Sequence, residues 1–366
     1  MSPKIFTLGS TTFDLFVKPK ETSVVRISRE TNCAEEFLVL PYGGKCLVEE
    51  VHEKYGGGGH NTAVGLTRLG LSAAPISCIG RDLYGKRILE NLEKEGIEGK
   101  YLAYAESQTG FSIIISSFEG ERTVLHHPGA SADFHDFDET LLTESEGVFF
   151  NHLSSDGTSS DRIFQKIKGH FLKYPEKFLA WNPGKEQLRG GVSSFQDFLP
   201  VVDILLLNRE EAELFTGKSA LKSEYEEHSI QKGAHFIPEK KQDFPHYAAN
   251  YDEIFTEFKK YGVQKVVITD GRKGAQLFDG KYIYFCGIDE SAERKDTLGA
   301  GDAFGSALFY TLFQKKDLSF SLKCATINAG SVVSHIGAQD GLLSSEVLFS
   351  RAEKTELHQA QKSFSS

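Results

Sequence analysis

The stretch DTLGAGDAFGSALF, residues 296–309, combines small residues with acids at a spacing that suits chemistry on an anion. Gly299, Ala300 and Gly301 precede an apolar run that is typical of a helix, and Asp302 falls in its first turn. Each glycine costs a helix about 1 kcal/mol relative to alanine, so the sequence must favour them for another reason. Small residues let a ligand approach the backbone, whose N–H groups at a helix N-terminus form an anion site.

An acid directly after such an anion site could act as a base. If an alcohol lay beside Asp302, its carboxylate could accept the hydroxyl proton. The anion site would meanwhile stabilise charge on a phosphoryl group in transfer. The alternative is a plain helix start, in which Asp302 only favours the helix dipole, as acids in that position often do. The stretch by itself leaves both interpretations open.

The bulk composition limits the class of protein around these residues. The chain has 366 residues, enough for one large α/β domain or two ordinary ones. A net charge of -10 argues against a nucleic-acid binder. The five cysteines are scattered and never form a C-x-x-C pair, which argues against a disulfide framework or a zinc site. No apolar window approaches the ~18 residues of a membrane span, so we expect no membrane partner and a cytoplasmic protein.

Apolar strands alternate with amphipathic helices along most of the chain. This alternation predicts a mostly parallel sheet with helices on both faces. The strands are expected at 5–8, 72–80, 147–153, 177–184, 202–208 and 263–271, with a hairpin at 274–286. The helices are expected at 56–70, 82–96, 160–174, 209–217, 251–262, 299–313 and 321–337. The alternation predicts two-sided burial of the strands.

Two regions do not fit the alternation. The pieces SVVRIS, EEFLVLPYGG and KCLVEEV are β-like but too mixed in polarity for the buried centre of a parallel sheet. Together with a hairpin near residue 118 they could pair into a lid formed from about 16–55 and 104–128. Residues 218–250 are polar without a clear period, which predicts a surface insertion. His228, His235 and His246 fall in it at spacings that match no metal-ligand pattern.

Two sequence signatures resemble those of the ribokinase, or PfkB, family of carbohydrate kinases. DTLGAGDAFGSAL is similar to the family's C-terminal motif D-T-x-G-A-G-D, and YGGGGHNTAVGLTRLG is similar to its N-terminal motif. GSTTFDLF, IGRDLYG, TGFSIIIS, LLLNREEAELF and VVITDGRKGA occur in family order, so the resemblance covers nearly the whole chain. It implies a ribokinase-like three-layer α/β/α fold, with 1–366 as a single domain and a small β-sheet lid.

The resemblance also implies an activity, an ATP-dependent transfer of the γ-phosphoryl group to a hydroxymethyl group of a sugar. Asp302 matches the family's general base, beside the anion hole formed by Gly299, Ala300 and Gly301. The matching substrate-binding residues are Asp14, Gly57, Gly58 and Asn61. The matching nucleotide-binding residues are Asn208, Glu211, Thr269, Gly271, Gly274, Thr297 and Asn328. Asn208 and Glu211 would also organise magnesium, largely through water. In many members a potassium ion lies near the anion hole, which here implies the main chain of Asp296 and Leu298.

Some positions keep a structural alternative. Asn61 and Asn208 could simply cap helices, with Glu211 suiting the dipole of the second one. Asp14 could be an ordinary turn residue. His60 and His152 fall near the site, but we assign them no catalytic role.

Two functional alternatives also stay open. A nucleoside kinase would want an aromatic pocket, which Phe13, Phe16 and Phe111 could provide. A catalytically silent sugar sensor would have no need of Asp302. In this family the lid supplies substrate contacts and often a homodimer interface, so we expect a homodimer here as one outcome.

Overall fold

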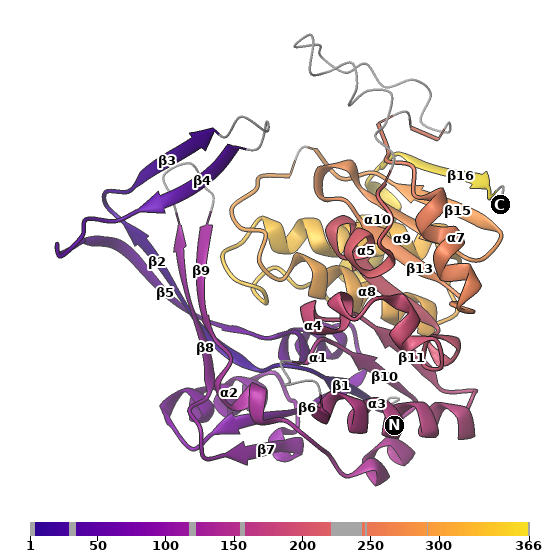
Figure 1. The fold of residues 1–366 in the computed structure, drawn as a ribbon, viewed down its shortest axis with the longest axis horizontal. Helices are drawn as coiled ribbons and strands as arrows, with labels where there is room; N and C mark the ends of the chain where they lie inside the picture. The colour runs from indigo at the N-terminus through magenta and orange to yellow at the C-terminus, as the bar shows by residue number, and fades with distance from the viewer. Residues whose placement is uncertain are drawn as a thin grey trace.

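A ten-stranded sheet forms the centre of the protein in the computed structural model, which describes residues 4–28, 34–116, 122–153, 158–220, 244–245, 247–290 and 292–364 (Figure 1). The strand order is β16-β15-β14-β13-β12-β11-β10-β1-β6-β7. Seven neighbouring strands are parallel: β1 (Lys4–Leu8), β6 (Ser72–Gly80), β7 (Leu102–Ala105), β10 (Gly147–Phe150), β11 (Phe178–Trp181), β12 (Ile204–Asn208) and β13 (Val266–Thr269). The remaining three are antiparallel at one edge: β14 (Ala275–Phe278), β15 (Tyr282–Cys286) and β16 (Gln359–Ser363). The predicted parallel sheet is confirmed.

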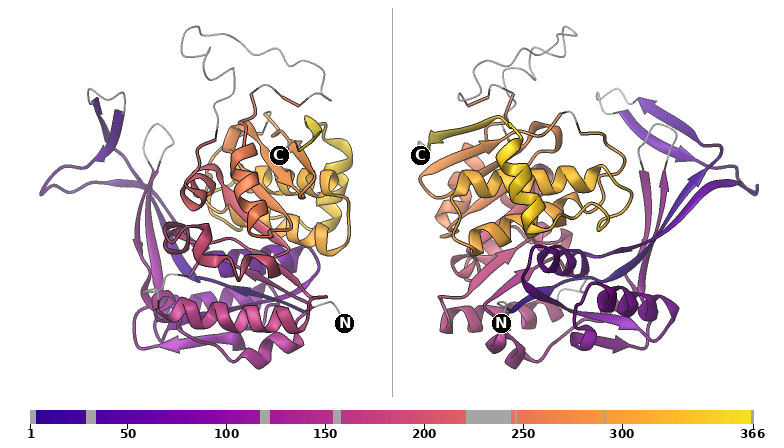
Figure 2. Two further views of the ribbon diagram at one scale, coloured as in Figure 1. Left: turned by 45° about the vertical axis from the view of Figure 1, so that its right-hand side comes forward. Right: turned by 180° about the vertical axis from the view of Figure 1, so that it is seen from behind.

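Helices cover both faces of this sheet. Successive strand residues alternate between two hydrophobic clusters, as Leu205 and Leu206 do, because neighbouring side chains of a strand point to opposite faces. One cluster includes residues of α2 (Leu83–Lys94), α3 (Thr158–Lys173), α5 (Arg209–Thr216) and α7 (Asp252–Lys260). The other includes residues of α8 (Ala300–Phe313), α9 (Leu318–Val333) and α10 (Ser345–Lys354), which Figure 2 shows together on one side. The three-layer architecture is confirmed.

A second sheet forms the lid beside the main body. Its order is β5-β2-β8-β9, with β2 at Thr12–Pro19, β5 at Val48–Gly56, β8 at Gly110–Ser116 and β9 at Arg122–His127. The parallel pairing of β2 with β8 joins two segments separated by the βαβ unit, as predicted. The lid begins at Thr12, earlier than expected, and Tyr104 and Ala105 belong to β7 of the main sheet instead.

The strands β3 (Ser23–Ser28) and β4 (Ala34–Val39) form a separate two-stranded sheet. Together with β5 they lie outside the main sheet, which confirms that part of the prediction. The expectation that all these pieces cover the site is wrong for β3 and β4, because they extend away from the main body in every view (Figures 1 and 2). A hairpin of this size has too little core of its own to fold against, so its position depends on the lid.

Four of the helices and strands were not expected from the sequence: β7, α4 (Lys185–Arg189), α10 and β16. The sequence of β16, QAQKS, has no apolar alternation, and it is a strand only because it pairs with β15 at the sheet edge. Of the expected insertion at 218–250, residues 221–243 and 246 lie outside the described residues, and with them His228, His235 and His246. The ends that are described are anchored, since Ala220 and Ala249 are buried.

Two further properties bear on the class of protein. Within the described ranges, no helix has the length and apolarity needed to cross a bilayer. Cys46, Cys78, Cys286 and Cys324 are free thiols, and Cys33 lies outside the described residues.

Close contact between α1 (Gly58–Arg68) and α8 positions the N-termini of both helices. A Cβ added to Gly65 of α1 would lie 2.5 Å from Ser306 Oγ and 2.9 Å from Ser306 Cβ. A Cβ on Gly305 would lie 2.7 Å from Phe149 Cζ in the sheet. The glycines therefore allow α8 to approach both its neighbour helix and the sheet more closely than other residues would.

We predict that Gly65→Ala destabilises the protein by about 1–3 kcal/mol, because overpacking forces the two helices apart. Gly169→Ala is the matched control, since Gly169 lies in helix α3 and an added Cβ there would meet nothing within 4 Å. That change should stabilise by about 0.5–1 kcal/mol through lower chain entropy. Urea unfolding of both variants measures the difference, and an unchanged midpoint for Gly65→Ala would show that the helix contact is loose.

Candidate active site

The first turns of α1 and α8 meet through a side-chain hydrogen bond. Asn61 Nδ2 donates to Asp302 Oδ2 at 2.8 Å, and Gln339 Nε2 donates to Asn61 Oδ1 at 3.1 Å. The second bond fixes the Asn61 amide with its donor toward the carboxylate. The capping alternative for Asn61 is wrong, because Gly57 is the N-cap of α1 and Asn61 lies within the helix. Asn61 is instead a buried link between two helices.

Asp302 lies in the first turn of α8 and is partly buried. Burial raises the pKa of its carboxyl above the ordinary value, and the hydrogen bond from Asn61 opposes that rise. Oδ2 is the atom that Asn61 contacts, which leaves Oδ1 to accept a proton from a neighbouring group. The carboxylate lies beside a pocket and at a helix N-terminus, which stabilises its negative charge.

The anion site predicted at Gly299–Gly301 has the expected backbone form. Gly299 is the N-cap of α8 with φ 75°, and a Cβ there would lie 2.3 Å from Ala338 Cβ. No side chain caps the helix, so N–H groups of its first turn keep their capacity to bind an anion. At Gly301 an added Cβ would meet nothing within 4 Å, which leaves the approach to these groups open.

Asp14 projects from β2 of the lid and is only 4% exposed. Its carboxylate accepts a hydrogen bond from Thr12 Oγ1 at 3.2 Å and one from the Ser112 hydroxyl. Burial raises its pKa to about 6, the two hydroxyls oppose the rise, and the charges of Asp296 and Asp302 add to it. A Cβ on Gly56 would lie 2.0 Å from Asp14 Oδ2, so the glycine makes room for this carboxylate. Asp14 is therefore a strand residue close to the other acids, and the turn alternative is wrong.

The two N-terminal glycines are part of the same turn. Gly57 has φ 90°, and a Cβ there would lie 2.4 Å from the carbonyl oxygen of Ser10. At Gly58 an added Cβ would lie 3.1 Å from the Asn151 side chain. Gly57 thus brings the start of α1 against the loop that follows β1, and Gly58 brings it against the segment that follows β10.

Asp296 receives three hydrogen bonds at the start of the same loop. The N–H groups of Leu298 and Gly337 donate to its carboxylate at 3.0 and 3.1 Å. Arg122 Nη1 of lid strand β9 forms an ion pair with its Oδ1 at 2.7 Å. A second lid strand is anchored nearby, because Lys54 of β5 pairs with Asp340. The lid is therefore tied to the loops around α8 at both of its edge strands.

Sequence reasoning missed Ser112, His126, Arg122 and Gln339. Ser112 Oγ lies 3.2 Å from His126 Nδ1 and extends the Asp14 network along the lid. The alternation of Arg122, Val124 and His126 along β9 was a usable signal, since all three share one face of a strand. The sequence could not tell which face meets Asp14, because that depends on the pairing of β8 with both β2 and β9.

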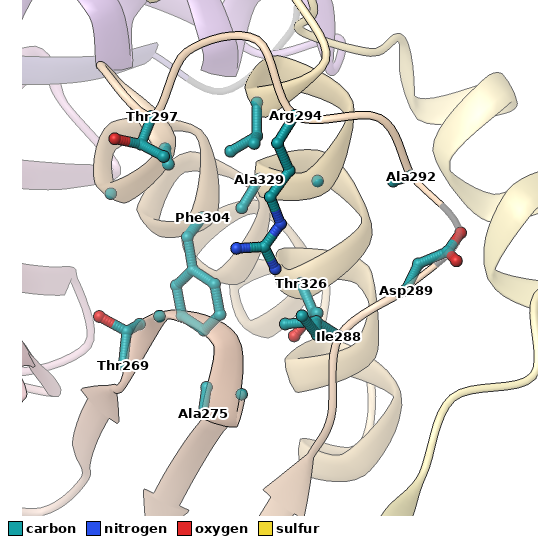
Figure 3. Close-up of a pocket in the computed structure, with 16 residues that line it drawn as sticks. Thr269, Ala275, Ile288, Asp289, Ala292, Arg294, Thr297, Phe304, Thr326 and Ala329 are labelled. Carbon is teal, nitrogen blue, oxygen red and sulfur yellow. The ribbon is translucent and has the colours of Figure 1, made fainter. Parts of the chain in front are cut away.

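A cavity of about 200 Å³ lies at the N-terminus of α8 (Figure 3). It brings together six of the predicted nucleotide-site and anion-hole residues from separate stretches: Thr269, Gly271, Gly274, Thr297, Ala300 and Gly301. The remaining lining is mostly small or apolar and includes Ile288, Phe304, Ala329 and Val333. Arg294, which the sequence analysis did not select, also lines it.

Asn208 and Glu211 form a reciprocal capping box at the start of α5. Asn208 Oδ1 accepts from the Glu211 N–H at 2.8 Å, and Glu211 Oε2 accepts from the Asn208 N–H at 2.8 Å. Burial raises the pKa of Glu211, and the charges of Glu210 and Asp302 add to that effect. The pair has the capping role that the sequence allowed, and Glu211 is also close enough to Asp302 to feel its charge.

Asn328 does not lie in the cavity. It is fully buried, donates to the Ala303 carbonyl at 2.7 Å and accepts from the Leu343 N–H at 3.1 Å. Its neighbours Thr326 and Ala329 line the cavity instead. The structure thus gives Asn328 a role in holding α9 against α8.

The aromatic pocket suggested for a nucleobase does not form. Phe13 stacks on Tyr84 with ring centroids 4.7 Å apart, on the face of the lid opposite Asp14, and Phe111 lies beside it. Phe16 is on the Asp14 face but only 5% exposed.

Of the two histidines near the site, His60 is fully buried and His152 is half-buried. Burial lowers the pKa of His60 to about 4 and also lowers that of His152. Neutral buried rings are consistent with structural roles.

Comparison with known proteins gives one consistent family. The model of the pfkB family carbohydrate kinases matches residues 23–345. A ribokinase of Haemophilus influenzae is 25% identical over 84% of this chain and 92% of its own length. An adenosine kinase of Schizophyllum commune is 24% identical over 92% of this chain and 97% of its own length.

Solved structures agree at the level of the fold. The ribokinase of Arabidopsis thaliana, determined with ribose and ATP, superimposes with a TM-score of 0.72 at 19% identity, covering 96% of this chain and 99% of that one. The match of the family model over most of the chain, together with this ribokinase-like architecture, shows that the protein belongs to the pfkB family of carbohydrate kinases.

Proposed function

We propose that the protein is an ATP-dependent kinase that phosphorylates a hydroxymethyl group of a sugar. The observation that carries the proposal is the Asp302 carboxylate, which Asn61 holds at the N-terminus of α8 between the lid residue Asp14 and the lined cavity. A base, an anion site and two adjoining binding regions are the parts that phosphoryl transfer to an alcohol requires. Family membership supports the same reaction class.

In this mechanism the sugar lies under the lid and the triphosphate in the cavity. Asp14 accepts hydrogen bonds from sugar hydroxyls and orients the reacting one. Asp302 removes its proton through the oxygen that Asn61 leaves open, and the alcohol oxygen attacks the γ-phosphorus in line. The proton ends on Asp302, and the bond to the leaving ADP oxygen breaks. The N–H groups at the start of α8 stabilise the charge that develops on the phosphoryl oxygens.

For magnesium, the supporting observation is electrostatic. The negative charge of Asp302 adds to the raised pKa of Glu211, and a divalent cation near Glu211 would offset that repulsion. Magnesium would neutralise charge on the phosphate oxygens. We propose that Asn208 and Glu211 organise the water ligands of the magnesium ion.

Three further expectations from the sequence remain proposals. Potassium at the main chain of Asp296 and Leu298 is one, and the Arg122 guanidinium already neutralises the Asp296 side chain there. A homodimer through the lid is another, and the exposed Val51 and Leu125 on its outer face favour it. The third is a cytoplasmic location.

A sugar is the preferred acceptor, with a nucleoside as the alternative. The lid face around Asp14 carries Ser112 and His126, which suit hydroxyl groups. Phe13 and Phe111, which could have bound a nucleobase, lie on the opposite face of the lid. The similarity to the adenosine kinase keeps a nucleoside acceptor as the alternative to be tested.

The test is a panel of acceptors with ATP and magnesium, measuring ADP release and locating the new phosphate by phosphorus NMR. Ribose, fructose, a keto-sugar acid, adenosine and inosine should be compared at equal concentration. We expect at least one sugar to be phosphorylated at a primary alcohol with the highest kcat/KM. Turnover of nucleosides alone would establish the alternative, whereas sugar binding without any ADP release would indicate a sensor.

The Asp14 carboxyl should make both stability and substrate binding depend on pH. A pKa raised from 3.8 to about 6 in the folded protein corresponds to about 3 kcal/mol. The wild type therefore loses stability as pH rises from about 4 through 6, because the unfolded chain ionises first. We predict that Asp14→Asn is up to about 3 kcal/mol more stable than wild type at pH 8 and equal to it below pH 4. Its KM for the sugar should be higher at pH 8.

Asp138→Asn is the control with the opposite sign. Asp138 is exposed, and hydrogen bonds from Thr140 lower its pKa, so this variant should lose stability above pH 4. Urea unfolding between pH 4 and pH 8 tests both variants. A stability difference for Asp14→Asn that does not change with pH would mean that Asp14 has an ordinary pKa.

A further inference from the structure

Arg294 extends into the cavity beside the N-terminus of α8 (Figure 3). It lies on the segment between β15 and α8, and its side chain stays exposed to solvent within the open cavity. In the part of the chain that the structure describes, Arg294 has no carboxylate within ion-pair distance and no side-chain hydrogen bond. Burial lowers the pKa of its guanidinium, which reflects its partial removal from water.

The surroundings compensate this charge only in part. The second influence that lowers the pKa of Arg294 is the positive charge of Arg272, and only the charge of Glu290 opposes it. Asp289 also lines the cavity, but Figure 3 shows its carboxylate on the far side from the guanidinium. Arg272 lies in η6 (Gly271–Lys273), the turn whose Gly271 and Gly274 line the same cavity. No ion pair involves Arg272 within the described ranges.

Other cations close to Arg294 have partners. Lys295, its neighbour in the chain, pairs with Glu293 at 3.9 Å. Arg122 of lid strand β9 pairs with Asp296 at 2.7 Å. Arg294 in the cavity and Arg272 on the adjoining turn are therefore unlike the basic residues around them. Arg294 near the N-terminus of α8 and Arg272 on the turn beside the cavity, neither of them ion-paired within the described residues, create a local positive potential in a protein of net charge -10.

We infer that Arg294 and Arg272 bind the polyphosphate of the nucleotide, and this inference rests on the proposed ATP-dependent kinase function. The planar guanidinium presents paired donors that match phosphate oxygens. Stacking of Arg294 on the base would explain one arginine, but it would leave the repulsion from Arg272 in place. An anion with several charges between the two removes that repulsion, and the apolar lining around Ile288 and Val333 remains for the base.

The test compares dissociation constants for ATP, ADP and adenosine by titration calorimetry, without a sugar and therefore without turnover. Arg294→Ala should weaken ATP and ADP by about 10- to 100-fold, the range of a charge-assisted hydrogen bond. Adenosine should bind both proteins equally within about twofold. Arg294→Lys should fall between, because an ammonium keeps the charge and loses the paired donors. Arg272→Ala should act in the same direction, and the double variant should lose less than the product of the two effects.

Lys295→Ala is the matched control, since it removes one positive charge from the adjacent position and does not line the cavity. It should bind all three ligands as wild type does. Unchanged ATP affinity in Arg294→Ala would overturn the inference, and so would an equal loss of adenosine, which indicates a contact to the base. If wild type itself bound neither ATP nor ADP, the proposed function would fail together with this inference.

Discussion

The hydrogen bond between Asn61 and Asp302 requires that two helices from opposite ends of the chain begin at the same point. Helix α1 follows lid strand β5, and α8 comes more than 230 residues later in the chain. Their N-termini meet only because Gly65 and Gly305 let α8 approach both α1 and the sheet. Gly299 adds the backbone turn, packed on Ala338, that sets where the first amides of α8 point. The geometry of the site thus depends on these glycines as much as on the side chains that form hydrogen bonds.

The same point in the fold gathers four acids, and each has a different compensation. Asp296 has a guanidinium and two backbone N–H groups, whereas Asp302 has one amide donor. Asp14 and Glu211 have hydroxyl or backbone donors and raised pKa values. Uncompensated negative charge in a binding site lowers stability in the absence of ligand, and the fold tolerates it where function requires it. Arg122 of the lid opposes this negative charge through its ion pair with Asp296.

Much of this arrangement could be predicted from the sequence. The apolar runs at β10 and β12 and the amphipathic helices between them determine the parallel sheet, because each pattern can be buried in only one way. The two glycine-rich motifs singled out Asp302 and Asn61, and the structure brings these two side chains together. Asn208 and Glu211 were correctly read as a helix start, since a capping box is a local pattern.

The parts that could not be predicted depend on contacts distant in the sequence. The neighbours of Asp14 follow from the pairing of β2 with β8, which no local pattern specifies. The strand β16 has polar residues and exists only through its edge pairing. Asn328 lies one position away from cavity residues, yet the rotation of α9 turns it into the core. Arg294 belongs to a segment without regular structure, so neither period nor motif distinguished it from Lys295.

The central claim is that Asp302 is the base, and the variant Asp302→Asn tests it most directly. Asparagine keeps the shape, can accept the hydrogen bond from Asn61 and suits a helix N-terminus, but it cannot take a proton. Glu346→Gln is the control, because it removes an acid from the first turn of α10. With the best acceptor of the panel, we predict that kcat of Asp302→Asn falls at least ~100-fold, while the melting temperature and ATP affinity are kept. Turnover within a few-fold of wild type, at equal stability, would contradict the assignment of Asp302 as the base.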